Sequence, residues 1–241
     1  MFFRKKSIEG TDLLRGFCDI HNHLLYGVDD GSRSAEESLA ALEWLEQQGV
    51  NTVWFTPHIM EDMPNTVEAL KSRFGELTAL YQGKIRLHLA AEYMLDGLFL
   101  KRWQAGDLLP LANRYLLVET SCVTPPYGFD ALLFDICNGK YRPVLAHPER
   151  YFYMRPEDYE KYKRRGILLQ LNLMSLSGIY GKEACRKAHG LLRKGMYDFV
   201  GTDVHRIAVL QKTGIQKCLS SAEACLLKQL AENNRLLERE D

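Results

Sequence analysis

Short apolar, β-branched runs alternate along the chain with segments that have helical spacing. Residues 51–56, for example, contain Thr-Val-Trp-Phe, and residues 17–23 alternate apolar with polar side chains as a half-buried strand does. The same pattern predicts seven strands, at 17–23, 51–56, 85–92, 115–119, 142–146, 167–171 and 198–201. Strands that alternate with helices pair in parallel, so this order predicts an α/β fold.

The predicted helices are bounded by capping and stop signals. Ser34 and Glu37 form a capping box before a helix that carries leucines on one face and stops at Gly49. The other helices are expected at 66–81, 129–138, 156–165, 182–194 and, near the C-terminus, about 215–240.

Seven β/α units in 241 residues suit a closed (β/α) barrel that is one unit short of the usual eight. An open, doubly wound sheet is the alternative, although no GxGxxG motif follows the first strand. No long Pro- or Ser-rich linker interrupts the chain. This favours one domain over residues 1–241, with a short N-terminal extension at 1–15.

Charge balance and hydropathy exclude two classes of partner. Lys plus Arg and Asp plus Glu both number 31, whereas a sequence-independent nucleic-acid binder normally carries a basic excess. The longest apolar runs, such as 115–118, are far shorter than the roughly 18 residues that cross a bilayer. We therefore expect no nucleic-acid partner and no membrane insertion.

The cysteines and the N-terminal residues indicate a cytoplasmic protein. Six cysteines are scattered without a CxxC motif, which is typical of reduced thiols. Residues 1–6 place their charges after an apolar pair with no apolar stretch behind them, so no secretory signal is expected. None of the six cysteines has an arginine six positions later, which excludes a cysteine-dependent phosphatase.

Side chains that bind divalent metals gather where the predicted strands end. His21 and His23 close the first strand, and their imidazoles share one face because strand side chains alternate. Each such residue taken singly has an ordinary explanation, as a core histidine or a carboxylate paired with a lysine. Because the carboxyl ends of barrel strands share one rim, nine such residues there predict a metal site. The nine are His21, His23, Asp30, His58, Glu92, Glu119, His147, Asp203 and His205.

The donor atoms narrow the metal and the chemistry. Imidazole and carboxylate ligands without thiolate suit Mn, Fe, Zn or Co, and nine ligands exceed the needs of one ion, so two or three ions are expected. Four carboxylates against three divalent ions leave a positive cluster that attracts a phosphate monoester. Arg150, three residues after His147, is the candidate phosphate clamp, and Asp30 is a candidate proton donor to the leaving group.

Several neighbouring residues have structural interpretations. His88 lies in mid-strand and is expected to be structural, and His189 lies on a helix and is expected to be exposed. Asp29 either caps its turn or assists the adjacent aspartate. The aromatic residues at 151–153 are expected to pack rather than to bind substrate, and Asn172 is by default a strand-end polar residue.

The candidate ligands lie within short motifs that span residues 19–205. These are Asp19-Ile20-His21-Asn22-His23, Asp29-Asp30-Gly31, Thr56-Pro57-His58, Glu92, Glu119, His147-Pro148-Glu149-Arg150 and Thr202-Asp203-Val204-His205. The motifs resemble those of the polymerase-and-histidinol-phosphatase (PHP) superfamily. Within it, the chain is most similar to the bacterial metal-dependent protein-tyrosine phosphatases of capsule and exopolysaccharide loci.

The resemblance implies a distorted (β/α)7 barrel with a three-metal site, normally of manganese, at the carboxyl ends of the strands. It implies that the substrate is phosphotyrosine in the tyrosine-rich tail of a partner kinase that controls polysaccharide export. Members also carry a second arginine a few residues after the last histidine, whereas here Arg206 directly follows it. The implied ligand sets are His21, His23, Glu92 and Asp203 for one ion, His58 and Glu119 with the shared Glu92 for the second, and Asp30, His147 and His205 for the third, with Arg150 on the phosphoryl group.

Three alternative functions remain open. A small-molecule phosphatase, such as one for histidinol phosphate, would use the same scaffold but a deep, selective pocket. A barrel amidohydrolase also begins with His-x-His, but such sites commonly use a bridging lysine, and no lysine ends a predicted strand. A non-enzymatic binding module predicts missing ligands, and none of the nine is missing.

Overall fold

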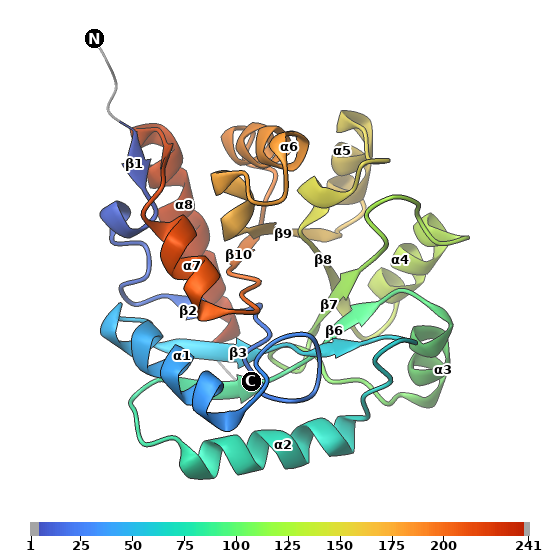
Figure 1. Cartoon of the computed structure of the whole chain (residues 1–241). Helices are drawn as coiled ribbons and strands as arrows, with labels where there is room; N and C mark the ends of the chain where they lie inside the picture. The colour runs from blue at the N-terminus through green and yellow to red at the C-terminus, as the bar shows by residue number, and fades with distance from the viewer. Residues whose placement is uncertain (1–4, 239–241) are drawn as a thin grey trace.

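The computed structural model describes residues 5–238, and its strands lie toward the middle with helices around them (Figure 1). Residues 1–4 of the expected extension and 239–240 of the expected last helix lie outside the described residues. The strands are β1 (Lys6–Ser7), β2 (Cys18–Asp19), β3 (Thr52–Phe55), β4 (His58–Ile59), β5 (Arg86–Leu89), β6 (Glu92–Met94), β7 (Tyr115–Glu119), β8 (Arg142–Ala146), β9 (Leu168–Asn172), β10 (Phe199–Gly201) and β11 (Lys217–Leu219).

The strands form two parallel sheets and one small antiparallel pair. One sheet has the order β10-β9-β8-β7-β6-β4, the other has the order β2-β3-β5, and β1 pairs with β11. In the larger sheet the strands follow chain order without the reversal that defines a doubly wound fold, which excludes that alternative. The expected parallel α/β fold is confirmed.

One of the seven predicted strands, at 85–92, is broken, and the one at 51–56 is followed by a short strand that was not predicted. The expected strand at 51–56 ends as β3 and restarts as β4 beyond Pro57, which has no N–H to donate to a ladder. The expected strand at 85–92 ends as β5 and restarts as β6, because the Ala90 N–H still donates to Phe55 in one sheet whereas the Ala91 N–H donates to Leu109. Both breaks carry the chain from the three-stranded sheet into the six-stranded sheet.

The helices match most of the predicted boundaries. Ser34 caps α1 by accepting a hydrogen bond from the Glu37 N–H at 3.4 Å, as the capping box predicts. Two helices, α3 and α7, were not expected. The helices are α1 (Ala35–Gln47), α2 (Val67–Leu80), α3 (Gly97–Ala105), α4 (Phe129–Asn138), α5 (Pro156–Arg164), α6 (Lys182–Arg193), α7 (Ile207–Gly214) and α8 (Ser221–Asn234). Among residues 5–238, none of them is both long enough and apolar enough to cross a bilayer.

The predicted last helix begins later than residue 215. Residues 217–219 form β11, and the capping box of Ser220 with Glu223 starts α8 at Ser221. The expected N-terminal extension is also integrated into the fold, because β1 pairs with β11 and the Ile8 and Leu13 side chains are buried in the core. Packing of the first residues against the last was not visible in the local sequence pattern.

A seam between β2 and β10 joins the two parallel sheets. The buried Asn234 amide at the end of α8 donates to the Cys18 and Val200 carbonyls at 2.7 and 2.6 Å and accepts from the Val200 N–H at 3.2 Å. Farther along the seam, the buried Asp19 carboxylate accepts the Thr202 N–H and hydroxyl at 2.9 and 2.7 Å. Side-chain hydrogen bonds therefore supplement the few backbone hydrogen bonds that cross this seam, such as the one from the His23 N–H to the Val204 carbonyl.

We predict that Asn234→Ala lowers the free energy of unfolding by about 2–4 kcal/mol, because it leaves buried backbone groups of both strands without partners. Urea denaturation followed by circular dichroism measures the loss. Asn233→Ala is the matched control, since this exposed neighbour makes one hydrogen bond, to the Asp198 carbonyl, and its loss costs about 0.5 kcal/mol or less. Equal midpoints for the two variants would show that the seam does not depend on Asn234.

Candidate metal centre

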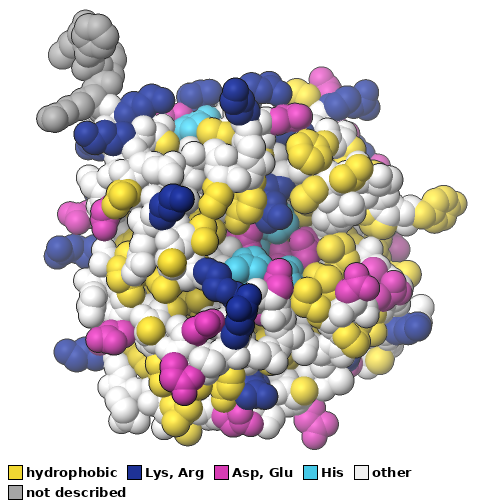
Figure 2. Space-filling view, viewed as in Figure 1, with side chains coloured by type: hydrophobic (Ala, Val, Ile, Leu, Met, Phe, Trp, Pro, Cys, Tyr) yellow, Lys and Arg dark blue, Asp and Glu magenta, His cyan; other side chains and the backbone are white. Residues whose placement is uncertain are grey.

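All nine predicted ligands come together in one hollow at the carboxyl ends of the parallel strands. Figure 2 shows histidine and acidic side chains gathered at the bottom of this hollow near the middle of the face. Their ligand atoms form four overlapping groups whose members lie within 4.8 Å of one another. The groups are His23, Asp30, His58 and His205; His21, His23 and Glu92; His21, His147 and Asp203; and His58, Glu92 and Glu119.

Glu92, at the start of β6, is the centre of the cluster and is fully buried. Its Oε2 lies 3.2 Å from His21 Nε2, 3.4 Å from His23 Nε2 and 3.1 Å from His58 Nδ1. Its Oε1 lies 3.1 Å from His147 Nε2. One carboxylate thus contacts four imidazoles from three different segments, as a shared ligand does.

Asp30 and His205 form the outer edge of the cluster. Their side chains are 56% and 29% exposed, and His205 Nε2 lies 3.3 Å from Asp30 Oδ1. A second imidazole near Asp30 is that of His58, whose Nε2 lies 3.7 Å from Asp30 Oδ1. The group that contains Asp30 includes His58 and not His147. Among the described residues, no group of candidate ligands joins His147 to Asp30, so the structure does not bring together the third set that the resemblance implies.

Polar residues behind the ligands hold them in place. His23 Nδ1 lies 2.8 Å from Asp29 Oδ2, and His21 Nδ1 lies 2.9 Å from Gln170 Oε1. The Asn172 amide donates to Asp203 Oδ2 at 2.6 Å. Such partners fix the ring orientation of metal-binding histidines. Asp29 therefore positions a ligand, and Asn172 contacts the site, but Gln170 had no sequence signal beyond its place on a predicted strand.

The backbone also shapes the hollow. A Cβ on Gly31 would lie 1.8 Å from the His23 carbonyl oxygen, and a Cβ on Gly201 would lie 2.5 Å from the His21 Cβ, so only glycine fits beside the His-x-His pair. His147 and Asp203 have φ angles of 33° and 50°, in the left-handed region that few non-glycine residues adopt. This conformation turns both strand-end ligands into the cluster, and such strain is common at functional sites.

Arg150 lies beside the ligand cluster and keeps donors free. One guanidinium nitrogen lies 3.0 Å from Asp203 Oδ2, and the group stacks on the Tyr180 ring at 4.5 Å from its centroid. Its side chain is 26% exposed, and the guanidinium has more N–H donors than the contact with Asp203 uses. By contrast, Arg206 donates to the Gly31 and His205 carbonyls, which engages it in holding the loop rather than in binding phosphate.

The carboxylates perturb the titration of their neighbours. The hydrogen bond from His205 lowers the pKa of Asp30 to about 2. Burial and the His23 imidazole oppose charging of His58, but Glu119 and Glu92 outweigh them and raise the pKa of His58 to about 10. Asp30 is therefore ionised at neutral pH, which suits a ligand better than the proton donor expected from the sequence.

The donor atoms fit divalent cations. Three buried ligand-type atoms have no hydrogen-bond partner: His58 Nδ1, Glu92 Oε2 and Glu119 Oε1. His58 Nδ1 lies 3.1 Å from each of the two carboxylate oxygens. Buried polar atoms that converge in this way suit a bound cation, which would offset the charge of the two carboxylates. Nitrogen and oxygen donors without sulfur match Mn, Fe, Zn or Co.

The residues interpreted as structural divide as follows. His88 stacks on Trp54 away from the cluster, and Tyr151 is buried with its hydroxyl donating to the Ala146 carbonyl, as expected. The expectation that His189 is exposed is wrong: it lies between α6 and α8, 2.9 Å from Glu223, with its side chain 16% exposed.

A comparison with family models places the chain. The model described as capsular polysaccharide synthesis, CpsB/CapC, matches residues 17–234, a range that contains all nine ligands. The chain belongs to the CpsB/CapC family. This membership confirms the resemblance to the bacterial phosphatases of capsule loci.

Two named relatives agree with the CpsB/CapC assignment. The tyrosine-protein phosphatase YwqE of Bacillus subtilis is 28% identical over 198 residues, covering 78% of this chain and 77% of YwqE. The tyrosine-protein phosphatase CpsB of Streptococcus pneumoniae is 29% identical over 211 residues, covering 78% of this chain and 83% of CpsB.

Structural comparison gives the same grouping. A crystal structure from the pair of metal-dependent tyrosine phosphatases YwqE of Bacillus subtilis and CpsB of Streptococcus pneumoniae aligns with this chain with a TM-score of 0.79 at 26% identity. The alignment covers 93% of this chain and 95% of that one. A phosphotriesterase homology protein from Escherichia coli aligns with a TM-score of 0.54 at 14% identity, covering 93% and 99%, and shares the fold alone.

We predict that Glu92→Gln weakens binding of Mn²⁺ by about 100-fold or more, because it removes the charge that the clustered imidazoles share. Isothermal titration of the metal-depleted protein with MnCl₂ measures the effect. Glu149→Gln is the matched control: Glu149 is equally buried but accepts hydrogen bonds from the Asn172 N–H and the Tyr197 hydroxyl. Unchanged Mn²⁺ affinity in Glu92→Gln would contradict the central role of this carboxylate.

Proposed function

We propose that this member of the CpsB/CapC family is a metal-dependent protein-tyrosine phosphatase. The observation that carries the proposal is the convergence of nine ligand-type side chains beside Arg150, in a chain whose relatives are named tyrosine-protein phosphatases. The chemistry of such a site is hydrolysis of a phosphate monoester, which needs a cationic cluster and an anion clamp.

Two or three divalent ions, with manganese favoured and Fe, Zn or Co as alternatives, would be held by the nine residues. Bound there, they would supply Lewis acidity toward phosphoryl oxygens and lower the pKa of water. The chain itself fixes the geometry before substrate arrives, because Asp29 and Gln170 orient the His23 and His21 imidazoles. Preorganised donors of this kind cost no rearrangement during the reaction.

Arg150 binds and orients the phosphoryl group in this proposal. Its planar guanidinium offers five donors, and the contact with Asp203 and the face of Tyr180 fix its direction while leaving other N–H groups available. Bidentate binding of two phosphoryl oxygens would then hold the phosphorus atom over the ligand cluster.

The leaving group explains why a strong general acid is not required. A tyrosine phenolate has a pKa near 10, so it departs far more readily than the alkoxide of serine. Asp30, with its pKa of about 2, is a carboxylate at neutral pH and has no proton to give. We therefore assign Asp30 to ligand binding and assign the protonation of the tyrosyl oxygen to solvent.

The exposed edge of the cluster favours a protein substrate over a small metabolite. Asp30 is more than half exposed, so one end of the site reaches the molecular surface, where a tyrosine on another protein can approach. A histidinol phosphatase would need a pocket that encloses its substrate. We infer that the substrate is a phosphotyrosine protein, specifically the tyrosine-rich tail of a bacterial kinase that regulates polysaccharide export, and that the reaction occurs in the cytoplasm.

We infer further that the two parallel sheets are arcs of one distorted (β/α)7 barrel in a single domain. The parallel bridge between Asn22 and Val204 supports this at one seam. At the other junction, where β3 gives way to β4 and β5 to β6, pairing continues past the ladder of β3 and β5: the Glu92 N–H donates to the Pro57 carbonyl.

We predict manganese-dependent phosphate release from a phosphotyrosine peptide and its abolition by chelator. Malachite-green detection measures it, with a phosphoserine peptide and histidinol phosphate run alongside. Release from histidinol phosphate alone would retain the metal centre and replace the substrate class. Absence of release from all three, with manganese bound, would exclude the proposed function.

We also predict that His147→Ala or Asp203→Ala abolishes turnover, and that Arg150→Lys lowers kcat/KM about 100-fold, because an ammonium cannot bind two phosphoryl oxygens in a plane. His88→Ala should retain nearly full activity, since this ring stacks on Trp54 away from the ligands. Steady-state kinetics with a phosphotyrosine peptide gives the values, and circular dichroism shows that the variants fold. Full activity in His147→Ala would rule out the ligand assignment.

A further inference from the structure

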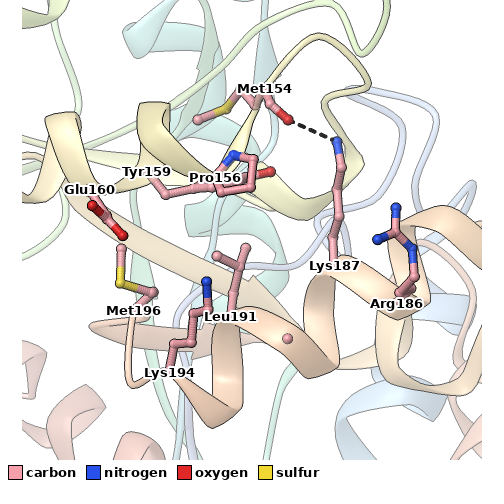
Figure 3. Close-up of a pocket in the computed structure, with 10 residues that line it drawn as sticks. Met154, Pro156, Tyr159, Glu160, Arg186, Lys187, Leu191, Lys194 and Met196 are labelled. Carbon is pink, nitrogen blue, oxygen red and sulfur yellow. Dashed lines mark hydrogen bonds between the residues drawn. The ribbon is translucent and has the colours of Figure 1, made fainter.

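A small pocket opens between α5 and α6, and none of the nine candidate ligands lines it (Figure 3). Its volume is about 210 Å³. Its apolar surface comes from Met154, Tyr159 and Leu191, which are almost completely buried. A space of this size takes one large apolar side chain rather than an extended ligand.

Basic side chains outnumber acidic ones around the pocket, whose lining has Arg186, Lys187 and Lys194 against the single carboxylate of Glu160. Arg186 and Lys194 are exposed at its rim, and within residues 5–238 neither has a carboxylate within 4.0 Å. From residue 155 to 194 the chain has ten Lys or Arg against four Asp or Glu, although its net charge is zero. Figure 2 shows Lys and Arg gathered along the upper edge, where Figure 1 places α5 and α6. The pocket therefore lies in a locally cationic surface.

Gly190 keeps the pocket open. It lies in the last turn of α6, and a Cβ there would meet no heavy atom within 4 Å. Glycine inside a helix is destabilising relative to alanine, and no steric clash prevents a larger residue here. Gly75 in α2 has the same open surroundings but does not line this pocket, which makes it a useful control.

The surroundings select among anionic partners. None of the exposed large hydrophobic residues in the described part of the chain lies on α5 or α6, so the two helices themselves offer no large apolar side chain to insert into a lipid surface and no aromatic ring on which a base could stack. A concave apolar pocket with a cationic rim instead matches a peptide that has acidic residues around one apolar side chain.

We propose that this α5–α6 pocket docks an acidic segment of a partner protein, which inserts one apolar side chain and pairs its carboxylates with Arg186 and Lys194. The pocket is fastened to the segment that carries Arg150. The Tyr159 hydroxyl donates to the Pro148 carbonyl at 3.2 Å, and the Lys187 ammonium donates to the Tyr151 and Met154 carbonyls at 2.7 and 3.2 Å. A docked partner would thus rest on the outer side of the catalytic turn.

Fluorescence anisotropy tests the proposal without turnover, so its result does not depend on the phosphatase assignment. The probe is a fluorescein-labelled decapeptide of Asp and Glu with one central Phe and no Tyr. The wild-type chain should bind it saturably, and a peptide with Ser in place of Phe should bind about tenfold more weakly. Two variants, Gly190→Leu, which fills the pocket, and the double charge reversal Arg186→Glu with Lys194→Glu, should each weaken binding about tenfold or more.

Matched variants on α2 give the controls. Gly75→Leu adds the same side chain to another open helical glycine, and Lys71→Glu reverses an exposed charge away from the pocket; both should change the affinity less than twofold. The proposal would be overturned if the α2 variants lost as much peptide affinity as the pocket variants, or if replacing the Phe of the peptide did not change its affinity. It would also be overturned if Gly190→Leu bound the peptide as tightly as the wild-type chain, a result that would indicate capture at the metal centre. Absence of peptide binding together with binding to phosphatidylglycerol vesicles would overturn it as well.

Discussion

A carboxylate with no exposure to water, that of Glu92, is the constraint around which the site is built. A buried negative charge is tolerated only when neighbouring groups offset it, and here four imidazoles do so from three separate segments. The same carboxylate contacts His58, which lies just beyond the break at Pro57, with its Nδ1 3.1 Å from Glu92 Oε2. Its position at the start of β6 requires the second break, after β5. The irregular strands are thus consequences of placing one charge at the centre.

Much of this was accessible from the sequence, because side chains at strand ends obey a simple rule. Parallel strands bring their carboxyl ends to one edge, so His21, His147 and Asp203 could be placed together although they are far apart in the chain. The pairing of Asp30 with His58 rather than with His147 was not accessible. It depends on how far the chain extends beyond each strand, and no periodicity encodes that distance.

Other features depend on contacts between segments that look ordinary in isolation. Gln170 appears as one polar residue in a buried strand, and only its approach to His21 Nδ1 reveals its role. The left-handed φ of His147 and Asp203 belongs to the folded loop and has no signature in residues of these types. Gly31 lies in a loop motif and Gly201 ends a predicted strand, and only the folded structure shows that the His-x-His pair packs against both of them.

The seam held by Asn234 has a consequence for how the protein comes into being on the ribosome. The backbone groups that this amide satisfies belong to Cys18 and to Val200, which is synthesised much later than Cys18. A nascent chain therefore carries the His-x-His strand with an open side until α8 has emerged. Domains generally fold as units during synthesis, and in this one β2 must wait for α8.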